Sequence, residues 1–469
     1  MELAVCRSMP DPTTSASAVA SQSGEDDHLR SSRVSMGIRE LTKSKLLRNI
    51  LTVVSGTAGA QMVAMAFMPI ITRLYGPENY GVLGVFLGLV AMTVPVAALT
   101  YPVSIVLPSR DDEGRNLVKL SIILAIGVAA LSAVQLHFFG GQLVALMGVE
   151  AITPFLMLLP LAMFCGAALE TAQQWLIRKQ RFKVTARVAV AHSIIHNIGR
   201  STAGLIHASA AMLVITTALG PLLHAGMLFF GIRRDKAIGR KHPEDQPIEV
   251  STILSVASRY SDFPVYRAPQ MLINAVSQNL PTLVLAAYFG ASAAGFFAIC
   301  KQTLSMPTHL IGKSVADVYY PKLAKAIQAE QPITGMLLKA FVGLAAVGLV
   351  PFATVFFFGP WLFSFVFGSE WAMAGELARW LALSEYAVFI SRPCTVAAPA
   401  LRLQRRYLVI EVISTVLRVS SLFIGALWIQ DALGTVIAFA MASIFIYTSL
   451  IFIVLYEARK WHKRLTPRS

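Results

Sequence analysis

The sequence predicts an all-α integral membrane protein with twelve transmembrane helices in two six-helix halves that are related by a parallel repeat. Three observations lead to this prediction: an apolar composition, an alternation of basic and uncharged connections, and a short internal repeat. Of the 469 residues, 55% are hydrophobic and 14% are charged, whereas an ordinary soluble domain is about 25% charged. The composition excludes a disordered chain and argues against a soluble enzyme.

The predicted helices follow from the apolar stretches of the chain. A helix that spans a bilayer needs about 20 mostly apolar residues, and twelve stretches meet this requirement. They are residues 49–73, 81–107, 117–139, 152–176, 185–207, 209–232, 264–289, 293–318, 335–358, 374–400, 407–429 and 432–456.

The connections between these stretches alternate in charge. Lys and Arg lie before the first stretch and after every second one, for example at Arg178 and Lys179. The intervening connections near 140–151, 289–293 and 430–432 contain no Lys or Arg. Basic loops stay on the cytoplasmic side of a membrane, so both termini are expected in the cytoplasm. This pattern also accounts for the formal net charge of +15 without a nucleic-acid partner.

Two segments repeat in the same order. The motif LYGPENYGVLGVF after the first stretch is similar to YFGASAAGFFAIC after the seventh, with Gly76 matching Gly290 and Gly81 matching Gly295. KQRFKV and QRRYLV, which follow the fourth and tenth stretches, form a second pair. Each half contains an even number of spans, so the two halves should have the same orientation, as parallel repeats do.

These predictions divide the chain into five parts. Residues 1–40 are polar, lack the apolar run of a secretory signal and are expected to form a disordered cytoplasmic tail. Residues 41–232 and 263–456 are the two halves, joined by a basic cytoplasmic loop at 233–262. Residues 457–469 are expected to form a basic cytoplasmic tail.

The first repeat and its surroundings also carry a family resemblance. ITRLYGPENYGVLGVFLGLV, WLIRKQRF and the long segment that starts SRYSDFPVYRAPQMLINAVSQNLP resemble the polysaccharide transporter family of Wzx-like oligosaccharide flippases. The resemblance covers about 45–456 and implies membership of the multidrug/oligosaccharidyl-lipid/polysaccharide exporter superfamily. It implies two lobes around a central cavity that opens alternately to each side, and an undecaprenyl-diphosphate-linked sugar repeat unit as the substrate.

Ionisable side chains inside the predicted spans are candidate site residues, because each costs about 2.5–3.5 kcal/mol on insertion scales. Arginine binds phosphate oxygens with two parallel hydrogen bonds, so the cations predict a cavity for a diphosphate and acidic sugars. Arg418 lies near mid-membrane and is the strongest candidate, with Glu385 or Glu411 as its expected partner. Ion pairing within the protein and, for residues near the cytoplasmic ends, snorkelling are the competing interpretations. The candidate cations are Arg418, Arg200, Lys301, Arg392 and Arg267, and the candidate ion-coupling acids are Glu170, Glu385 and Glu411.

Other chemistries find little support in the sequence. His192 and His196 are four residues apart, but no third ligand is apparent, so packed histidines or proton carriers are expected rather than a metal site. No GxxxxGK[ST] motif occurs, which excludes direct ATP use through that motif. The four cysteines form no CxxC motif. Neither a cofactor nor a catalytic residue is predicted.

The leading prediction is a non-enzymatic flippase of the bacterial inner membrane that supplies O-antigen, capsule or exopolysaccharide synthesis. A polysaccharide polymerase and a chain-length regulator are expected partners, besides the lipid-linked oligosaccharide and the bilayer. A cation-coupled multidrug exporter of the same superfamily is the first alternative, although it would favour an acidic cavity. A membrane polymerase or acyltransferase is the second, but the external connections are short and no His–Asp constellation is evident.

Overall fold

The computed structural model describes residues 45–234, 252–329, 331–394, 397 and 404–465. Within these ranges every regular element is a helix, and seven segments are long and apolar enough to cross a membrane. The chain is therefore a multi-pass α-helical membrane protein. The predicted tail 1–40, most of the predicted loop 233–262 and the last residues of the predicted tail 457–469 lie outside the described residues.

Residues 45–234, called the N-terminal half below, contain five long helices. They are α2 (Lys45–Ala97), α4 (Asp111–Met147), α5 (Leu158–Arg178), α6 (Phe182–Ile206) and α7 (Ala210–Arg234), with the short α3 (Tyr101–Ser104) and the 3-10 helix η1 (Glu150–Phe155) between them. The helix α8 (Ile253–Arg259) follows the segment that is not described.

Residues 263–465, the C-terminal half, begin with one turn of π-helix. The elements are η2 (Phe263–Arg267), α9 (Ala268–Gln328), α10 (Thr334–Phe367), η3 (Ser369–Trp371), α11 (Ala372–Ile390), α13 (Gln404–Ile424), η4 (Gly425–Ile429) and α14 (Ala432–Leu465).

The longest helix of each half bends at a glycine of the sequence repeat. In α2 the bend is at Gly76 (φ 70°, ψ 173°), and in α9 it is at Gly290 (φ 85°, ψ 173°). This region of backbone space is essentially restricted to glycine. The apolar segments that contain the bends have 43 and 46 residues. At about 1.5 Å per residue, each is long enough for two crossings of a hydrocarbon core about 30 Å thick.

Three of the stretches predicted from the sequence are not among the seven apolar segments. The segments 152–176, 185–207 and 374–400 contain α5, α6 and α11, which are helices of 21, 25 and 19 residues. These helices carry candidate site residues, namely Glu170 on α5, Arg200 on α6 and Glu385 on α11. Three of the candidate site residues are therefore on helices that hydropathy alone does not select.

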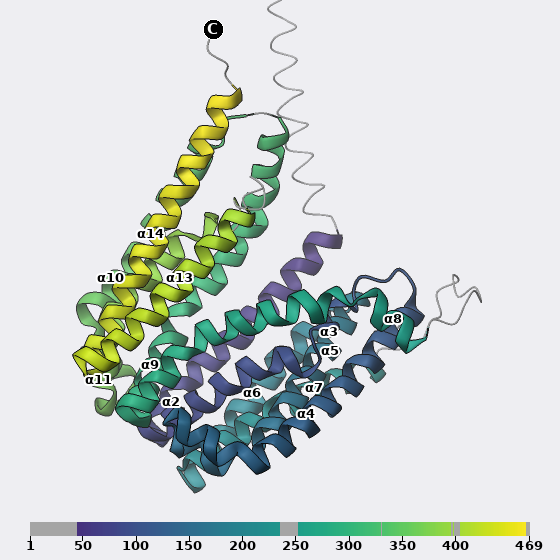
Figure 1. Ribbon diagram of the computed structural model, residues 1–469, viewed down its shortest axis with the longest axis vertical. Helices are drawn as coiled ribbons and strands as arrows, with labels where there is room; N and C mark the ends of the chain where they lie inside the picture. The colour runs from purple at the N-terminus through teal and green to yellow at the C-terminus, as the bar shows by residue number, and fades with distance from the viewer. Residues whose placement is uncertain (1–44, 235–251, 330, 395–396, 398–403, 466–469) are drawn as a thin grey trace, which may run out of the picture.

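Figure 1 shows the helices in two groups that diverge toward the end of the molecule at which the described chain begins and ends. The group with α10, α11, α13 and α14 lies on one side, and the group with α3 to α8 lies on the other. The two bent helices, α2 and α9, pack against each other. One apolar core includes Phe86 of α2, Phe297 of α9 and Trp371 of η3, so it joins the two halves where they converge.

At the convergent end the two bends contact each other reciprocally. A Cβ atom on Gly81 would overlap the carbonyl oxygen of Ala291, and one on Gly295 would overlap that of Pro77. Gly81 is separated from Gly295, and Pro77 from Ala291, by the same 214 positions. Trp371 Nε1 also donates a hydrogen bond of 3.3 Å to the carbonyl of residue 72. At this end α2 and α9 are in contact through main-chain atoms, and the Trp371 hydrogen bond adds a side-chain contact.

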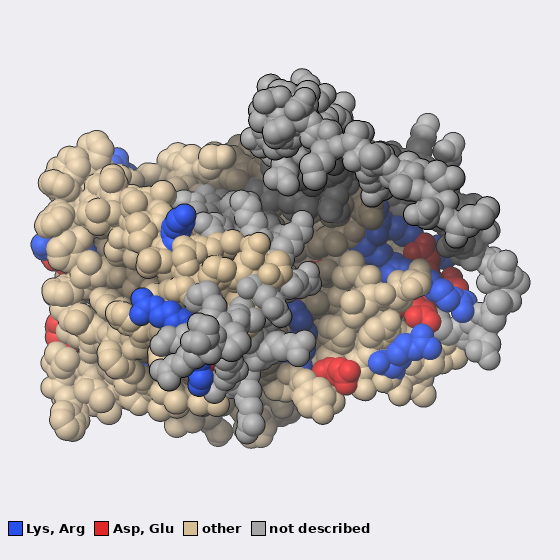
Figure 2. Space-filling model, turned by 90° about the horizontal axis from the view of Figure 1, so that it is seen from above, with Lys and Arg blue, Asp and Glu red and all other residues tan. Residues whose placement is uncertain are grey.

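At the divergent end the connection between the halves packs on the N-terminal half. Val256 of α8 lies in an apolar cluster with Tyr101, Ile105 and Leu117, and Arg259 forms an ion pair of 2.6 Å with Glu113 at the start of α4. Figure 2 looks onto this end and shows charged side chains of both signs gathered at one side of the visible surface. The segment predicted as a loop at 233–262 therefore contains a helix in its described part.

Candidate functional site

A cavity of about 740 Å³ lies within the N-terminal half, between α2, α5, α6 and α7. Its polar lining comes from four helices: Thr57 and Gln61 from α2, Gln173 from α5, Thr185, His192, Ser193, His196, Asn197 and Arg200 from α6, and His224 from α7. No Asp or Glu is among the residues that line it. We refer to this space as the histidine cavity.

The helical period explains why α6 supplies most of the polar lining. His192, His196 and Arg200 are four residues apart and therefore share one face of α6. The neighbouring residues fix this face toward α2, because Ser193 Oγ donates a hydrogen bond of 2.7 Å to the carbonyl of Ala60. Asn197 is buried and donates to the carbonyl of Ser193 at 2.7 Å.

The three histidines of the cavity are stacked. The ring of His192 lies between the other two, with centroids 5.2 Å from His196 and 4.4 Å from His224, and the rings are within 16° of parallel. His192 Nε2 is 3.0 Å from the carbonyl oxygen of Gly220, and His196 Nε2 is 3.2 Å from that of Thr216. Both carbonyls belong to α7, so the stack joins α6 to α7.

Arg200 is the one Lys or Arg in the lining of the histidine cavity. Within the described part of the chain its guanidinium forms neither an ion pair nor a hydrogen bond, and its Nε atom is buried without a partner. Its main-chain carbonyl accepts a hydrogen bond of 2.9 Å from the Tyr75 hydroxyl. A buried polar group usually has a partner, so this guanidinium is a candidate for binding an anion.

The candidate cations of the C-terminal half, in contrast, have acidic neighbours. Lys301 Nζ of α9 is 3.2 Å from Glu385 Oε1 of α11, and the Glu385 side chain is only 8% exposed. Arg418 Nη2 of α13 is 3.9 Å from Glu411 Oε1 of the same helix. The Arg418 side chain is 7% exposed and the Glu411 side chain is 41% exposed. The guanidinium of Arg418 also lies over the ring of Tyr447, 5.4 Å from its centroid.

These contacts decide between the partners that the sequence left open for Arg418. The expected pair with Glu385 is wrong, because α11 packs against α9 and Glu385 there contacts Lys301. The partner of Arg418 is instead Glu411, seven residues earlier on the same helix, at a distance beyond that of a hydrogen bond.

The remaining predicted site residues lie apart from the histidine cavity. Arg267 is exposed in η2, with its guanidinium 5.9 Å from the centroid of Phe263. Arg392 is half-buried, directly after the end of α11, and Glu170 is half-buried on α5. None of them lines the cavity. Of the five predicted cations, the structure places only Arg200 there.

His224 is a residue of the cavity that sequence reasoning missed. It lies inside the apolar stretch of α7, and its Nε2 atom is buried without a hydrogen-bond partner in the described structure. The signal was the same as for His192, an ionisable group within an apolar run. Among the described residues no three His, Cys, Asp or Glu side chains are arranged to hold a metal ion.

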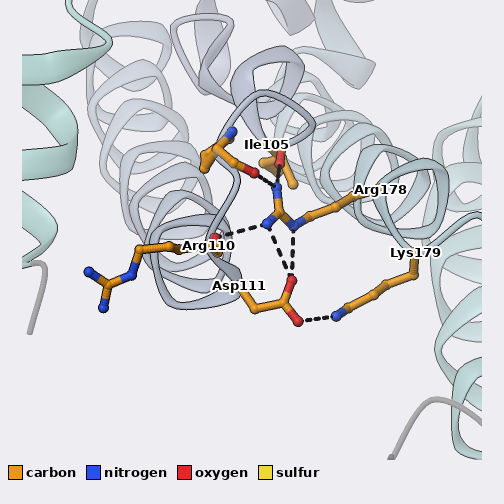
Figure 3. Close-up of polar contacts among 6 residues, drawn as sticks. Ile105, Arg110, Asp111, Arg178 and Lys179 are labelled. Atoms are coloured by element: carbon orange, nitrogen blue, oxygen red, sulfur yellow. Dashed lines mark hydrogen bonds and ion pairs between the residues drawn. The ribbon is translucent and has the colours of Figure 1, made fainter. Parts of the chain in front are cut away.

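A second polar cluster lies at the divergent end of the N-terminal half (Figure 3). Arg178 at the end of α5 donates hydrogen bonds to the carbonyls of Ile105 (3.0 Å) and Arg110 (2.8 Å), and to the carboxylate of Asp111. Lys179 contacts the other oxygen of this carboxylate. The Arg178 guanidinium thus binds the chain just before α4. Because its donors are used within the protein, this cluster fixes the loop rather than offering an open binding site.

Comparison with known proteins gives matches to proteins of transport and polysaccharide synthesis. Residues 70–376 match the model of a family described as polysaccharide biosynthesis protein. The chain is 22% identical, over 356 residues, to the succinoglycan biosynthesis transport protein ExoT of Rhizobium meliloti (strain 1021). This match covers 74% of the chain and 66% of ExoT, slightly less than two thirds of that protein.

Solved structures show the same fold at low sequence identity. The lipid II flippase MurJ in an inward closed conformation has a TM-score of 0.64 at 12% identity, covering 89% of this chain and 90% of MurJ. An inward-facing multidrug resistance MATE family transporter of the MOP superfamily has a TM-score of 0.58 at 13% identity, covering 88% and 95%. A MOP superfamily transporter from Pyrococcus furiosus, described as having a binding pocket of reverse polarity, has a TM-score of 0.58 at 12% identity, covering 90% of this chain and 96% of that transporter.

Proposed function

Because the chain belongs to the polysaccharide biosynthesis protein family, we propose that it is a flippase for undecaprenyl-diphosphate-linked oligosaccharide repeat units. It moves these units across the bacterial inner membrane, for the synthesis of O-antigen, capsule or exopolysaccharide. The likeness to a succinoglycan biosynthesis transport protein supports a polysaccharide substrate, and the fold shared with a lipid II flippase supports a lipid-linked one. The chain acts as a transporter and not as an enzyme.

The observation that carries this proposal is the charge of the histidine cavity. Arg200 lines the cavity without a carboxylate beside it, and no acidic residue is among the lining residues. An unpaired guanidinium attracts a diphosphate or an acidic sugar and repels a cationic drug. This polarity favours the flippase over the alternative of a cation-coupled multidrug exporter, although the chain also shares its fold with a multidrug resistance transporter.

The mechanism we propose is alternating access by two lobes of six transmembrane helices each, around a central cavity. Twelve transmembrane helices follow from this proposal if α2 and α9 each cross the membrane twice, on either side of the bends at Gly76 and Gly290, and the other long helices cross once. These other helices are α4, α5, α6, α7, α10, α11, α13 and α14. The reciprocal contacts of Gly81 and Gly295 are those that a two-fold axis would produce. In Figure 1 the two groups of helices diverge toward the end at which the described chain begins and ends, and this end is the cytoplasmic side if both termini are cytoplasmic.

Energy for the cycle comes from the charge of the substrate. A net negative substrate leaves the cytoplasm readily under an inside-negative potential, at about 2.3 kcal/mol per charge and 100 mV. The return of the empty cationic cavity is the harder step, and proton or sodium binding at Glu170, Glu385 or Glu411 assists it. Outside the membrane a polymerase and a chain-length regulator receive the repeat unit.

Deletion of the gene tests the substrate. We expect surface polysaccharide to disappear and lipid-linked repeat units to accumulate on the cytoplasmic face of the membrane. Sensitivity to cationic dyes, with surface polysaccharide unchanged, would replace the flippase with the drug exporter. Complementation with the wild-type gene controls for effects on neighbouring genes.

Cysteine labelling tests the orientation. Single cysteines at Gly141, Ser292 and Asp431, introduced into a chain whose own cysteines are replaced, should react with an impermeant reagent in intact cells. Cysteines at Gly114 and Lys236 should react only after the cells are opened. Reaction of the second pair in intact cells would overturn the proposed topology.

A further inference from the structure

The histidine cavity has the size and polarity of a ligand site. Its volume of about 740 Å³ is within the usual range of about 300–1,000 Å³ for small-molecule sites. The polar groups converge from four helices and include the amides of Gln61 and Gln173, which can both donate and accept hydrogen bonds. Arg200 is the only Lys, Arg, Asp or Glu among its described lining residues.

The geometry of the stack determines what the histidines offer. The carbonyls of Gly220 and Thr216 only accept hydrogen bonds, so the hydrogens on His192 and His196 are on Nε2. If neighbouring rings were protonated, their positive charges would lie only 4.4–5.2 Å apart. The Arg200 guanidinium, one helical turn after His196, would add a further positive charge beside them. The rings are therefore best accommodated as neutral imidazoles, and Nδ1 of His192 and His196 is then a hydrogen-bond acceptor.

Two buried atoms of the cavity lining have no partner in the described structure. They are Nε of Arg200 and Nε2 of His224. Burial without a partner is costly for a polar group. The partners missing here are an anionic or neutral acceptor for Arg200 and a hydroxyl or similar group for His224. A sugar that carries an acidic group supplies both.

We propose that the histidine cavity is a subsite for the sugar headgroup, in which Arg200 binds an anionic substituent and the histidine stack accepts hydrogen bonds from sugar hydroxyls. This inference rests on the proposed function. It adds that the sugar headgroup is the part of the substrate that binds in the N-terminal half. The anionic oxygens can come from the carboxylate of an acidic sugar or from the diphosphate, and the probes below separate these two sources.

Binding to the purified full-length protein in nanodiscs tests the subsite, by titration calorimetry or ligand-observed NMR. The probes are a disaccharide with one glucuronate residue, the same disaccharide with glucose in that position, and inorganic pyrophosphate. We expect the acidic disaccharide to bind about tenfold more tightly than the neutral one, because only it uses Arg200. Equal affinity for the two disaccharides, or no binding of either, would overturn the proposal.

Two variants test the roles of Arg200 and of the histidine stack separately. Arg200→Gln should remove the preference for the acidic disaccharide and leave the neutral one bound as before. His192→Phe keeps an aromatic ring in the stack but removes its acceptor, so it should weaken both disaccharides by a similar factor and leave pyrophosphate unaffected. If His192→Phe leaves both sugars bound as in the wild type, the stack does not contact sugar. If only pyrophosphate binds, and binding requires Arg200, the cavity is a diphosphate site.

Gly220→Val is a third variant, and it disturbs the stack without deleting a polar side chain. A Cβ atom at Gly220 would lie 2.8 Å from His196 Nε2, so the larger residue displaces the ring and should also weaken both disaccharides. Normal binding by this variant and by His192→Phe, with thermal melting as in the wild type, would contradict the proposal.

Export is measured separately, so that the two proposals can fail independently. A His192→Phe protein that binds no sugar but exports polysaccharide normally would contradict the subsite and leave the flippase proposal intact. A deletion strain that still exports polysaccharide would refute the proposed function, while the binding measurements would still decide whether the cavity holds a sugar.

Discussion

The two halves of the molecule share a backbone feature but differ in their charges. In each half the first long helix bends at a glycine with almost the same backbone angles, at Gly76 and at Gly290. In the N-terminal half Arg200 lines a cavity without an acidic neighbour. In the C-terminal half Lys301 and Arg418 lie beside Glu385 and Glu411. The two bends therefore have similar geometry, while the charges inside the two halves differ.

This difference separates two roles for a cation inside a membrane protein. A charge with a partner is already compensated, so it contributes to folding and must exchange its partner before it can bind anything else. A guanidinium without an acidic partner keeps its charge available to a ligand, at a cost in folding free energy. We therefore expect substitutions in the N-terminal half to affect export more than stability, and those in the C-terminal half to affect stability at least as much.

The largest effect is expected for Arg200→Glu. Reversal of the charge in the cavity repels an anionic substrate, and export should fall by about 100-fold or more, in line with the 2–5 kcal/mol associated with a buried charged contact. Surface polysaccharide, normalised to the amount of protein in the membrane, measures this effect.

The exposed Arg187 is the matched control for Arg200, because Arg187→Glu makes the same charge change on the same helix outside the histidine cavity. Arg187→Glu should export normally. Export by Arg200→Glu at the level of the control would show that Arg200 does not contact the substrate.

Lys301→Ala should mainly reduce stability. It leaves Glu385 without its partner, and that carboxylate is only 8% exposed. A cost of about 1–3 kcal/mol is expected for the unsatisfied group, visible as a lower melting temperature of the purified protein. The double variant Lys301→Met with Glu385→Gln should recover most of the loss. A single variant as stable as the wild type would show that the pair makes no contribution to folding.

Arg418→Ala should have a smaller effect than Lys301→Ala. Its partner Glu411 is 41% exposed and 3.9 Å away, so removal of the guanidinium leaves a carboxylate that is much less buried than Glu385. The loss is expected to be about 0.5–1 kcal/mol, chiefly from the contact with the ring of Tyr447. Arg418→Lys should retain most of this contribution to stability, because it keeps the positive charge. An export defect in Arg418→Glu as severe as that in Arg200→Glu would place Arg418 on the substrate path after all.

The smallest difference is expected between the two bends. Alanine at Gly76 or at Gly290 should cost about 1–3 kcal/mol in each case, because both residues have the same strained angles for a residue with a Cβ atom. The neighbourhoods differ little, since only Gly76 has a neighbour near the added Cβ, the Glu370 carboxylate at 3.3 Å. Melting temperatures of the two variants that differ widely would contradict the equivalence of the bends.

The sequence was sufficient to predict an all-α multi-pass membrane protein but not the cavity. Apolar runs predict the long helices because this signal is local. The site depends on packing between helices that the sequence does not specify. Arg200 and Arg418 both appear as arginines inside apolar stretches, and only the packing of α6 against α2 and α7 makes one of them line a cavity. For the same reason the sequence left Glu385 and Glu411 open as partners of Arg418 and did not indicate the contact between Glu385 and Lys301.

Transport in a defined system tests the function most directly. Purified protein in liposomes that carry an undecaprenyl-diphosphate-linked oligosaccharide can be assayed for the movement of this lipid from one leaflet to the other, with a membrane-impermeant enzyme or lectin as the reporter. We predict that the wild-type protein speeds the movement well above that of empty liposomes, that Arg187→Glu does so equally, and that Arg200→Glu does not. Two results would contradict a flippase whose substrate binds at Arg200. One is that the wild-type protein moves the lipid no faster than protein-free liposomes do, and the other is that Arg200→Glu moves it as fast as the wild type.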